Sequence, residues 1–138
     1  MSPVTIAFDD SAETAKAVRD GLTEFNRRAV NFPEPVPVNV AVRDGSGALH
    51  GGVVARVTHD TLYMDIVWLE ETLRGGGHGR AMIEQVEDKA RALGARLAWL
   101  YTLSWQARPF YEKLGYRVFG EMPFADGAHR RYFLRKDL

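Results

Sequence analysis

Cysteine is absent from this chain of 138 residues. Its absence excludes disulfide bonds, thiolate metal sites and a cysteine nucleophile together, so any catalysis must use other side chains. The lack of cysteine also fits a reducing compartment, and we expect a cytoplasmic protein that holds no metal ion.

An excess of charge of one sign is also lacking, because the chain has 18 lysine and arginine residues and 18 aspartate and glutamate residues. This balance gives no support to nucleic acid or to an anionic membrane surface as the partner. No apolar run approaches the length of a membrane span, and the start of the chain lacks the basic stretch and long apolar run of a signal peptide. We therefore expect no nucleic acid and no membrane among the partners.

A domain linker, an internal repeat and a low-complexity segment are likewise missing. A chain of this length can bury one packed core, and we expect a single domain over residues 1–138. Prolines at positions 33, 35 and 37 exclude regular helix there, since each fixes its backbone and removes a hydrogen-bond donor.

What is present is a series of short apolar patterns separated by turn residues. Alternating or continuous apolar runs predict strands, and apolar residues at intervals of three and four predict helices. In chain order we expect strands at 4–8, 38–42, 49–57, 62–69, 97–103, 116–119 and 131–134, and helices at 10–29, 80–93 and 109–114. This β-α-β-β-β-α-β-α-β-β order is typical of a mixed sheet flanked by helices.

Three positions modify these patterns. Gly21 weakens the first helix and predicts a bend or a split. The pair of glycines at 51 and 52 indicates a bulge or a close approach between backbones. In the strand from 62 to 69, strict alternation places Ile66 and Trp68 on the same face as Leu62, and Asp65 interrupts the apolar character of the other face.

The most informative segment runs from Arg74 to Arg80, Arg-Gly-Gly-Gly-His-Gly-Arg, where a strand gives way to a helix. Glycine lets the backbone turn with its N–H groups pointing inward, and the start of a helix carries a partial positive charge. Together with two arginines, these groups form a site for phosphate oxygens. The plain alternative is a glycine-rich turn without a ligand.

The segment contains Arg74-x-x-Gly77-x-Gly79, and a buried strand follows it before Ala107 to Tyr116, Ala-Arg-Pro-Phe-Tyr-Glu-Lys-Leu-Gly-Tyr. In this order and spacing, the motifs resemble the GNAT superfamily of N-acetyltransferases, most strongly over residues 62–120. The resemblance implies a single-domain α/β (α+β) fold, with a mixed, mostly antiparallel sheet of six to seven strands. Three to four helices would flank this sheet, and it would be splayed at the cofactor site.

The resemblance also implies a site for acetyl-CoA as the acyl donor. The pyrophosphate would bind the backbone N–H groups and two arginines of the loop, which comprises Arg74, Gly75, Gly76, Gly77, His78, Gly79 and Arg80. The pantetheine arm would bond to the backbone of Val67 and Leu69 at the splayed strand. Ser104 stands where the family usually has an asparagine that contacts pantetheine or caps the next helix, and serine can still cap.

Tyr111 matches the tyrosine that many relatives use as the general acid toward the departing CoA thiolate, with a core tyrosine as the alternative. Pro109 either distorts the first turn of a helix that begins at Ser104 or is itself the first residue of the helix. In both cases Tyr111 would shift slightly. Asp65 stands where many relatives place an acidic residue and is the candidate base for the amine. Two alternatives to this role stay open: a purely structural role for Asp65, and proton transfer through water without a fixed base. Reserve candidates are Glu70, Glu71, His59 and His129.

The resemblance, together with these residues, implies direct transfer of an acetyl group, in a ternary complex, to a primary amine of a small molecule, an amino acid or a peptide. The alternative is a non-catalytic acyl-CoA-binding or sensor module. A dinucleotide-binding protein is disfavoured, because the glycine loop follows the fourth predicted strand rather than the first. The identity of the acceptor and the formation of a homodimer stay open.

Overall fold

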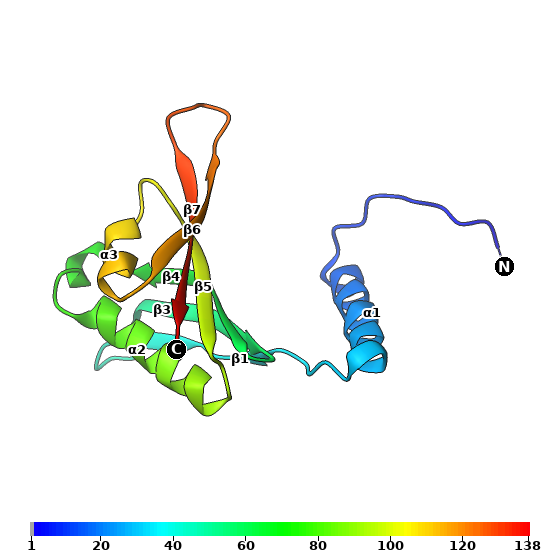
Figure 1. Ribbon diagram of the computed structural model, residues 1–138, viewed down its shortest axis with the longest axis horizontal. Coiled ribbons are helices and arrows are strands. Elements are labelled where there is room, and N and C mark those ends of the chain that lie inside the picture. Colours follow the sequence, from blue (N-terminus) through cyan, green and yellow to red (C-terminus); the bar gives the residue numbers. More distant parts are fainter. Residues whose placement is uncertain (1) are drawn as a thin grey trace. The chain divides into compact units, whose positions relative to one another are not determined.

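The structure, a computed structural model, describes residues 2–138 and contains two compact units that divide after Glu34. The first unit holds one helix, α1 (Ala12–Val30), and the second holds the sheet and the other helices (Figure 1). Helix α1 begins after Ser11, whose hydroxyl accepts a 3.2 Å hydrogen bond from the backbone N–H of Thr14. It continues through Gly21 as one helix, so the split expected there does not occur.

Val4 to Phe8 do not form the strand that their apolar character predicts, and this segment has no regular secondary structure. An isolated strand is not stable in water, because its backbone groups need a neighbouring strand for their hydrogen bonds. The observed order is therefore α-β-β-β-β-α-β-α-β-β, with a short 3₁₀ turn, η1 (Glu71–Leu73), before the second α-helix.

The second unit contains a mixed sheet that confirms the expected fold class. Its strands are β1 (Val36–Pro37), β2 (Val40–Arg43), β3 (Leu49–Thr58), β4 (Thr61–Leu69), β5 (Leu97–Leu103), β6 (Arg117–Pro123) and β7 (Arg130–Asp137). Their spatial order is β1-β3-β4-β5-β7-β6, and β2 lies beside β3. All neighbours are antiparallel except β4 and β5, which are parallel.

Strands β4 and β5 are paired at one end only. Thr61 to Tyr63 pair with Leu97 to Trp99, and the pairing does not continue beyond these residues. Each strand keeps its antiparallel neighbour on the other side, β3 or β7, over its full length. The sheet is therefore splayed between the carboxyl ends of β4 and β5, as the family resemblance implies.

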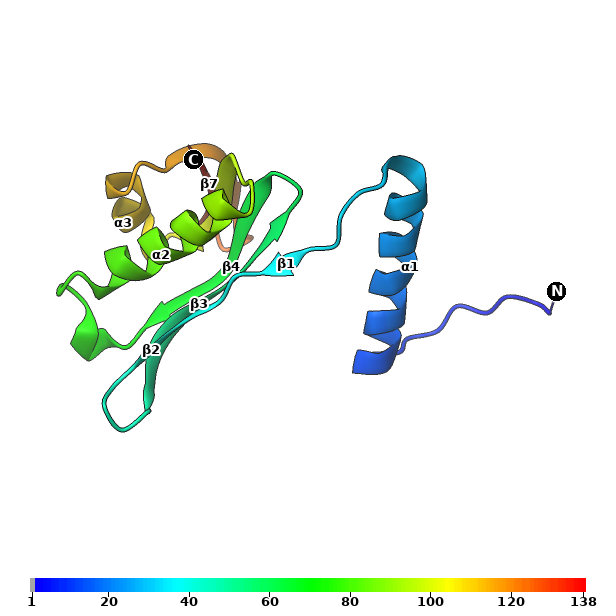
Figure 2. The same cartoon turned by 90° about the horizontal axis from the view of Figure 1, so that it is seen from below.

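Helices α2 (His78–Ala92) and α3 (Arg108–Lys113) lie on the same side of the sheet (Figure 2). The apolar stripe of α2 packs on the sheet, and one aromatic residue of α3 joins the same core. The fully or almost fully buried members of this core include Val53, Leu62, Leu100, Leu134, Ile83, Val86 and Tyr111. This packing fixes the positions of both helices at the splayed end of the sheet.

A buried charged cluster ties α2 to β7. The carboxylate of Glu87 on α2 is 3% exposed and accepts a 2.8 Å hydrogen bond from the Tyr116 hydroxyl. The Lys136 ammonium of β7 lies 3.0 Å from the same carboxylate. Burial, and then the nearby Glu87 carboxylate, raise the pKa of the Tyr116 phenol above its usual value, so it stays protonated and donates.

A β-bulge on β4 sets the position of Asp65. Val54 of β3 pairs with Ile66, and the next residue, Ala55, pairs with Met64. Asp65 is therefore the extra residue of β4 and has no partner in the ladder. Bulges bend a strand and redirect a side chain, and they are common beside active sites.

The bulge also reverses the alternation of faces along β4. Before it, Leu62 is fully buried, and after it Ile66 and Trp68 are exposed while Val67 and Leu69 pack against the core. The prediction that Ile66 and Trp68 share the face of Leu62 is therefore wrong. One extra residue moves every later side chain to the opposite face.

Gly51 and Gly52 lie where β3 is closely approached by both of its neighbours. A Cβ added at Gly52 would overlap the carbonyl oxygen of Val40 in β2, and one added at Gly51 would lie 2.6 Å from the carbonyl oxygen of Trp68 in β4. The close backbone approach predicted from this pair is confirmed.

We expect Gly52→Ala to lower the free energy of unfolding by about 1–3 kcal/mol, because β2 must move away from β3 to admit the methyl group. Equilibrium unfolding in urea measures this loss. Gly45→Ala is the matched control, since a Cβ there meets no atom within 4 Å. An equal loss in the two variants would contradict the packing argument.

Candidate active site

The glycine loop connects η1 to α2 and has the backbone geometry of an anion site. Gly75 and Gly77 have φ angles of 82° and 88°, which glycine adopts without steric cost. Gly77 is the N-cap of α2, and no side chain accepts a hydrogen bond from the first turn there. The first backbone N–H groups of α2 therefore remain available to an anionic ligand.

The charges around the loop favour the same kind of ligand. The first turn of α2 has no acidic residue, and it contains Arg80, which pairs with Glu84 at 3.3 Å. Arg74 donates a 3.0 Å hydrogen bond to the carbonyl oxygen of Leu69, which holds its guanidinium beside the end of β4. A cation at the positive end of a helix is unfavourable alone and favourable beside a bound anion.

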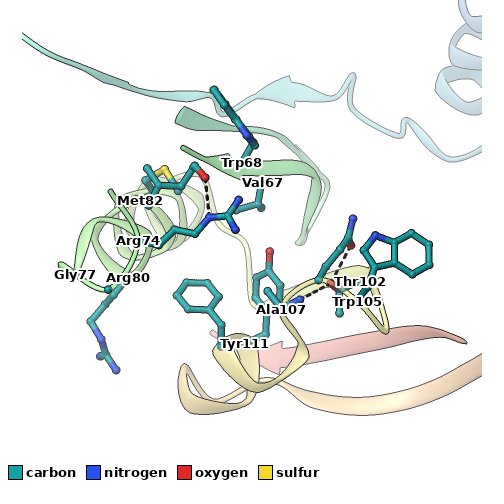
Figure 3. Close-up of a pocket in the computed structure, with 15 residues that line it drawn as sticks. Val67, Trp68, Arg74, Gly77, Arg80, Met82, Thr102, Trp105, Ala107 and Tyr111 are labelled. Carbon is teal, nitrogen blue, oxygen red and sulfur yellow. Dashed lines mark hydrogen bonds between the residues drawn. The ribbon is translucent and has the colours of Figure 1, made fainter. Parts of the chain in front are cut away.

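A pocket of about 720 Å³ opens beside this loop (Figure 3). Its lining comprises Val67, Trp68, Leu69, Arg74, Gly75, Gly77, Gly79, Arg80, Met82, Thr102, Trp105, Gln106, Ala107, Phe110 and Tyr111. Most of the predicted cofactor-binding residues are thus brought together in one cavity. Gly76, His78 and Ser104 are the predicted residues that do not line it.

Gly79 brings the start of α2 close to α3. A Cβ added at Gly79 would lie 3.1 Å from two ring atoms of Phe110, which itself lines the pocket. This contact joins the glycine-loop end of the cavity to the helix that carries Tyr111.

A second pocket, of about 220 Å³, occupies the gap between the diverging ends of β4 and β5. Asp65 and Tyr111, the two predicted catalytic residues, both line it. It shares Val67, Thr102, Gln106 and Tyr111 with the larger pocket. The two cavities therefore meet at Tyr111.

Tyr111 is held rigidly on α3, where it is 5% exposed. The helix begins at Arg108 with Pro109 in its first turn, and the Tyr111 N–H donates a 3.3 Å hydrogen bond to the carbonyl oxygen of Ala107. The proline therefore lies where its missing donor costs little. Figure 3 shows the Tyr111 phenol pointing from α3 toward Val67 of β4.

Burial raises the pKa of the Tyr111 phenol to about 12. Because that pKa is higher than the ordinary value of about 10, the phenol stays protonated over the whole range from about pH 6 to pH 10. We expect no decline in kcat/KM in this range that is due to Tyr111. The measurement is a pH profile of kcat/KM for the wild type and Tyr111→Phe; a decline near pH 10 in the wild type alone would contradict this expectation.

Asp65 is exposed on the bulge of β4 and lies beside Tyr63. Burial, and then the negative charge of Asp65, raise the pKa of the Tyr63 phenol. The Tyr63 ring in turn packs on Trp99 of β5, with 4.3 Å between ring centroids. Asp65 therefore has aromatic neighbours at the paired end of the strands and an open side toward water.

Ser104 has another role than the one implied by the resemblance. Its hydroxyl accepts a 3.1 Å hydrogen bond from the N–H of Arg130 and lies 3.2 Å from Nδ1 of His129. Ser104 thus joins the end of β5 to the start of β7, and the N-cap of α3 is Ala107 instead. The reserve candidates Glu70, Glu71, His59 and His129 line neither of the two pockets.

Sequence reasoning missed several residues that line the pockets. Thr102 and Gln106 contribute polar groups, and Trp68, Met82, Trp105, Ala107 and Phe110 contribute walls. Thr102 lies near the end of β5, and Gln106 lies between that strand and the Ala107 to Tyr116 motif. The position of Gln106 beside this motif is therefore a signal in the sequence. The residue types of Thr102 and Gln106 by themselves do not indicate a ligand.

The model of the acetyltransferase (GNAT) family matches residues 7–116 of the chain. The chain belongs to this family. An acetyltransferase of Agrobacterium fabrum is 27% identical over 117 residues, which cover 84% of this chain and 85% of the relative. Blasticidin-S acetyltransferase of Streptomyces morookaense is 30% identical over 119 residues, which cover 85% of this chain and 88% of that protein.

A solved structure agrees with this assignment. The crystal structure of an assigned acetyltransferase from Agrobacterium tumefaciens matches this GNAT protein with a TM-score of 0.88 and 25% identity, over 99% of both chains. Within residues 2–138, no helix is long and apolar enough to cross a membrane. In the same part of the chain, no three acidic, histidine or cysteine side chains are grouped so that they could hold a metal ion.

Proposed function

We propose that this GNAT acetyltransferase transfers the acetyl group of acetyl-CoA to a primary amine of a small molecule, an amino acid or a peptide. The observation that carries the proposal is the meeting of two cavities at Tyr111. One cavity extends from the glycine loop, and the other contains Asp65. Acetyl-CoA with its phosphates at the glycine loop can therefore place its acyl group between the Tyr111 phenol and the Asp65 carboxylate.

The residues of the larger pocket suit the parts of acetyl-CoA. The pyrophosphate would meet the first N–H groups of α2 together with Arg74 and Arg80. The pantetheine arm carries amide groups, and the edge of β4 facing β5 has backbone groups beyond Tyr63 that do not pair with β5, although the carbonyl oxygen of Leu69 accepts from Arg74. Val67 and Leu69 lie on that edge, where an extended arm can bond as an added strand would.

The reaction moves two protons off the acceptor nitrogen and one onto the CoA sulfur. The ammonium of the acceptor loses its first proton to Asp65 or to water, and the free amine attacks the thioester carbon. A C–N bond forms, the attached nitrogen releases its second proton to water, and the C–S bond breaks, so that the electron pair leaves with the CoA sulfur. Tyr111 donates its proton to this thiolate and later regains one from water. The high pKa of Tyr111 keeps the donor form fully populated.

Two observations bear on the acceptor. Asp65 places a negative charge at the smaller pocket, which favours a cationic amine. The name of one relative, blasticidin-S acetyltransferase, gives blasticidin-S as that protein's substrate. This name supports a small molecule as the acceptor. A sensor that only binds acyl-CoA would need neither a buried tyrosine donor nor a carboxylate at the end of the pocket.

The test is CoA release with a panel of amines that includes blasticidin-S, amino acids and short peptides, followed by mass spectrometry of the product. Calorimetric titration with acetyl-CoA, NAD and ATP identifies the donor independently. Acetyl-CoA binding with an N-acetylated product would support the proposal. Binding without release of CoA for any amine would favour the sensor, and tighter binding of NAD would overturn both. Asp65→Asn with unchanged kcat would assign the first proton transfer to water.

A further inference from the structure

Gln106 has a side-chain amide whose orientation is fixed by its neighbours. Its Oε1 accepts a 2.9 Å hydrogen bond from the backbone N–H of Leu103 and a 3.1 Å bond from the Thr102 hydroxyl. A backbone N–H can only donate, so the atom facing Leu103 must be the oxygen and not the nitrogen of the amide. Thr102 is itself 3% exposed and accepts from the N–H of Ala107 at 3.5 Å. The amide is therefore held in one orientation.

This orientation leaves the nitrogen of Gln106 with two free donors. Both lone pairs of its oxygen are used, and Nε2 makes no hydrogen bond to any other residue between 2 and 138. Gln106 lines the larger pocket and also the smaller one that holds Asp65 and Tyr111. The two unused N–H donors therefore belong to a side chain at the junction of the cavities.

We infer that Gln106 donates a hydrogen bond from Nε2 to the carbonyl oxygen of the bound acyl thioester. This inference rests on the proposed function, which places the thioester where the two pockets meet. The carbonyl oxygen gains negative charge when the amine attacks, and a fixed donor stabilises that charge more than it stabilises the ground state. The side-chain amide of Gln106 is neutral and does not act as a base, so it can donate beside Asp65 without competing for the proton of the amine.

Two substitutions separate this role from a purely structural one. Gln106→Glu keeps an oxygen that accepts from Leu103 and Thr102, and it replaces the N–H donors with a second acceptor. Gln106→Met removes the acceptor and the donors together. A structural role predicts a loss in Gln106→Met alone, whereas the donor role predicts a loss in both variants. Gln85→Glu, on the exposed side of α2, is the matched control for the change in charge.

We expect kcat/KM to fall about 10²–10³-fold in both Gln106 variants, with no change in Gln85→Glu. Calorimetry should show acetyl-CoA binding weakened about 3- to 10-fold in Gln106→Glu, and free CoA binding within about twofold of the wild type. Wild-type kcat/KM in Gln106→Glu would overturn the inference. So would an equal loss of affinity for free CoA and acetyl-CoA, because the donor would then contact the pantetheine arm.

The calorimetric comparison also separates this inference from the proposed function. If the wild type released no CoA with any amine, the proposed reaction would fail. The selective weakening of acetyl-CoA relative to CoA in Gln106→Glu would still be expected, since it depends on binding alone. Its absence would overturn the role of Gln106 whatever the acceptor is. An unfolding midpoint close to that of the wild type confirms that Gln106→Glu is folded.

Discussion

Tyr111→Phe is expected to lower kcat by about 10²–10⁴-fold, which is the contribution typical of a positioned general acid. The substitution removes one hydroxyl and keeps the ring, so the packing of α3 on the core should survive. Acetyl-CoA affinity should change little, because the glycine loop that we propose binds the phosphates is untouched. Steady-state kinetics with the best amine of the panel measures the first effect, and calorimetry measures the second.

The matched control is Tyr132→Phe, which removes a phenol hydroxyl from β7 outside both pockets. Its kcat should remain close to that of the wild type. Unchanged kcat in Tyr111→Phe would remove the tyrosine from the mechanism. A parallel loss of kcat and of acetyl-CoA affinity would instead indicate that Tyr111 shapes the pocket without donating a proton.

The largest effect on stability is expected at the buried carboxylate of α2. Glu87→Ala removes the partner of the Lys136 ammonium and of the Tyr116 hydroxyl together. The substitution leaves the partly buried Lys136 ammonium and the buried Tyr116 hydroxyl without their partner, so the free energy of unfolding should fall by about 3 kcal/mol, the lower end of the range for a broken buried pair. Equilibrium unfolding in urea at neutral pH measures the loss.

Two further variants define the origin of this effect. Asp88→Ala, one residue along α2, breaks an exposed pair with Arg91 and should change the unfolding free energy by less than about 1 kcal/mol. Glu87→Gln can still accept from Tyr116 but leaves Lys136 without a negative partner, so an intermediate loss is expected. A loss in Glu87→Ala as small as in Asp88→Ala would show that the cluster is not a stabilising contact.

The local structure of the candidate site follows from the sequence where the residue type itself limits the backbone. Gly75 and Gly77 were expected to form a tight loop, and their positive φ angles require glycine. Pro109 limited the start of α3 to a few residues. Leu100 and Ile83 are in the core because long apolar patterns at strand and helix periods are strongly constrained by burial.

The errors arose where local pattern and tertiary pairing disagree. The bulge at Asp65 depends on the register between β3 and β4, which alternation along one strand cannot reveal. Val4 to Phe8 have the composition of a strand, but composition does not supply a partner strand. The resemblance implies that Ser104 can cap α3, but the N-cap is Ala107, and the Ser104 hydroxyl accepts from the N–H of Arg130, 26 residues later. The position of Gln106 at both pockets depends on tertiary structure that no local pattern describes.

The short paired segment between β4 and β5 determines how the two halves of the sheet are joined at the candidate site. Three register pairs join the two strands, from Thr61 to Tyr63 and from Leu97 to Trp99, and the smaller pocket opens directly beyond them. The two antiparallel halves of the sheet are therefore joined by these three pairs alone, and the rings of Tyr63 and Trp99 pack together beside them with centroids 4.3 Å apart. The width of the smaller pocket, which Asp65 and Tyr111 both line, is thus set by residues that lie outside that pocket.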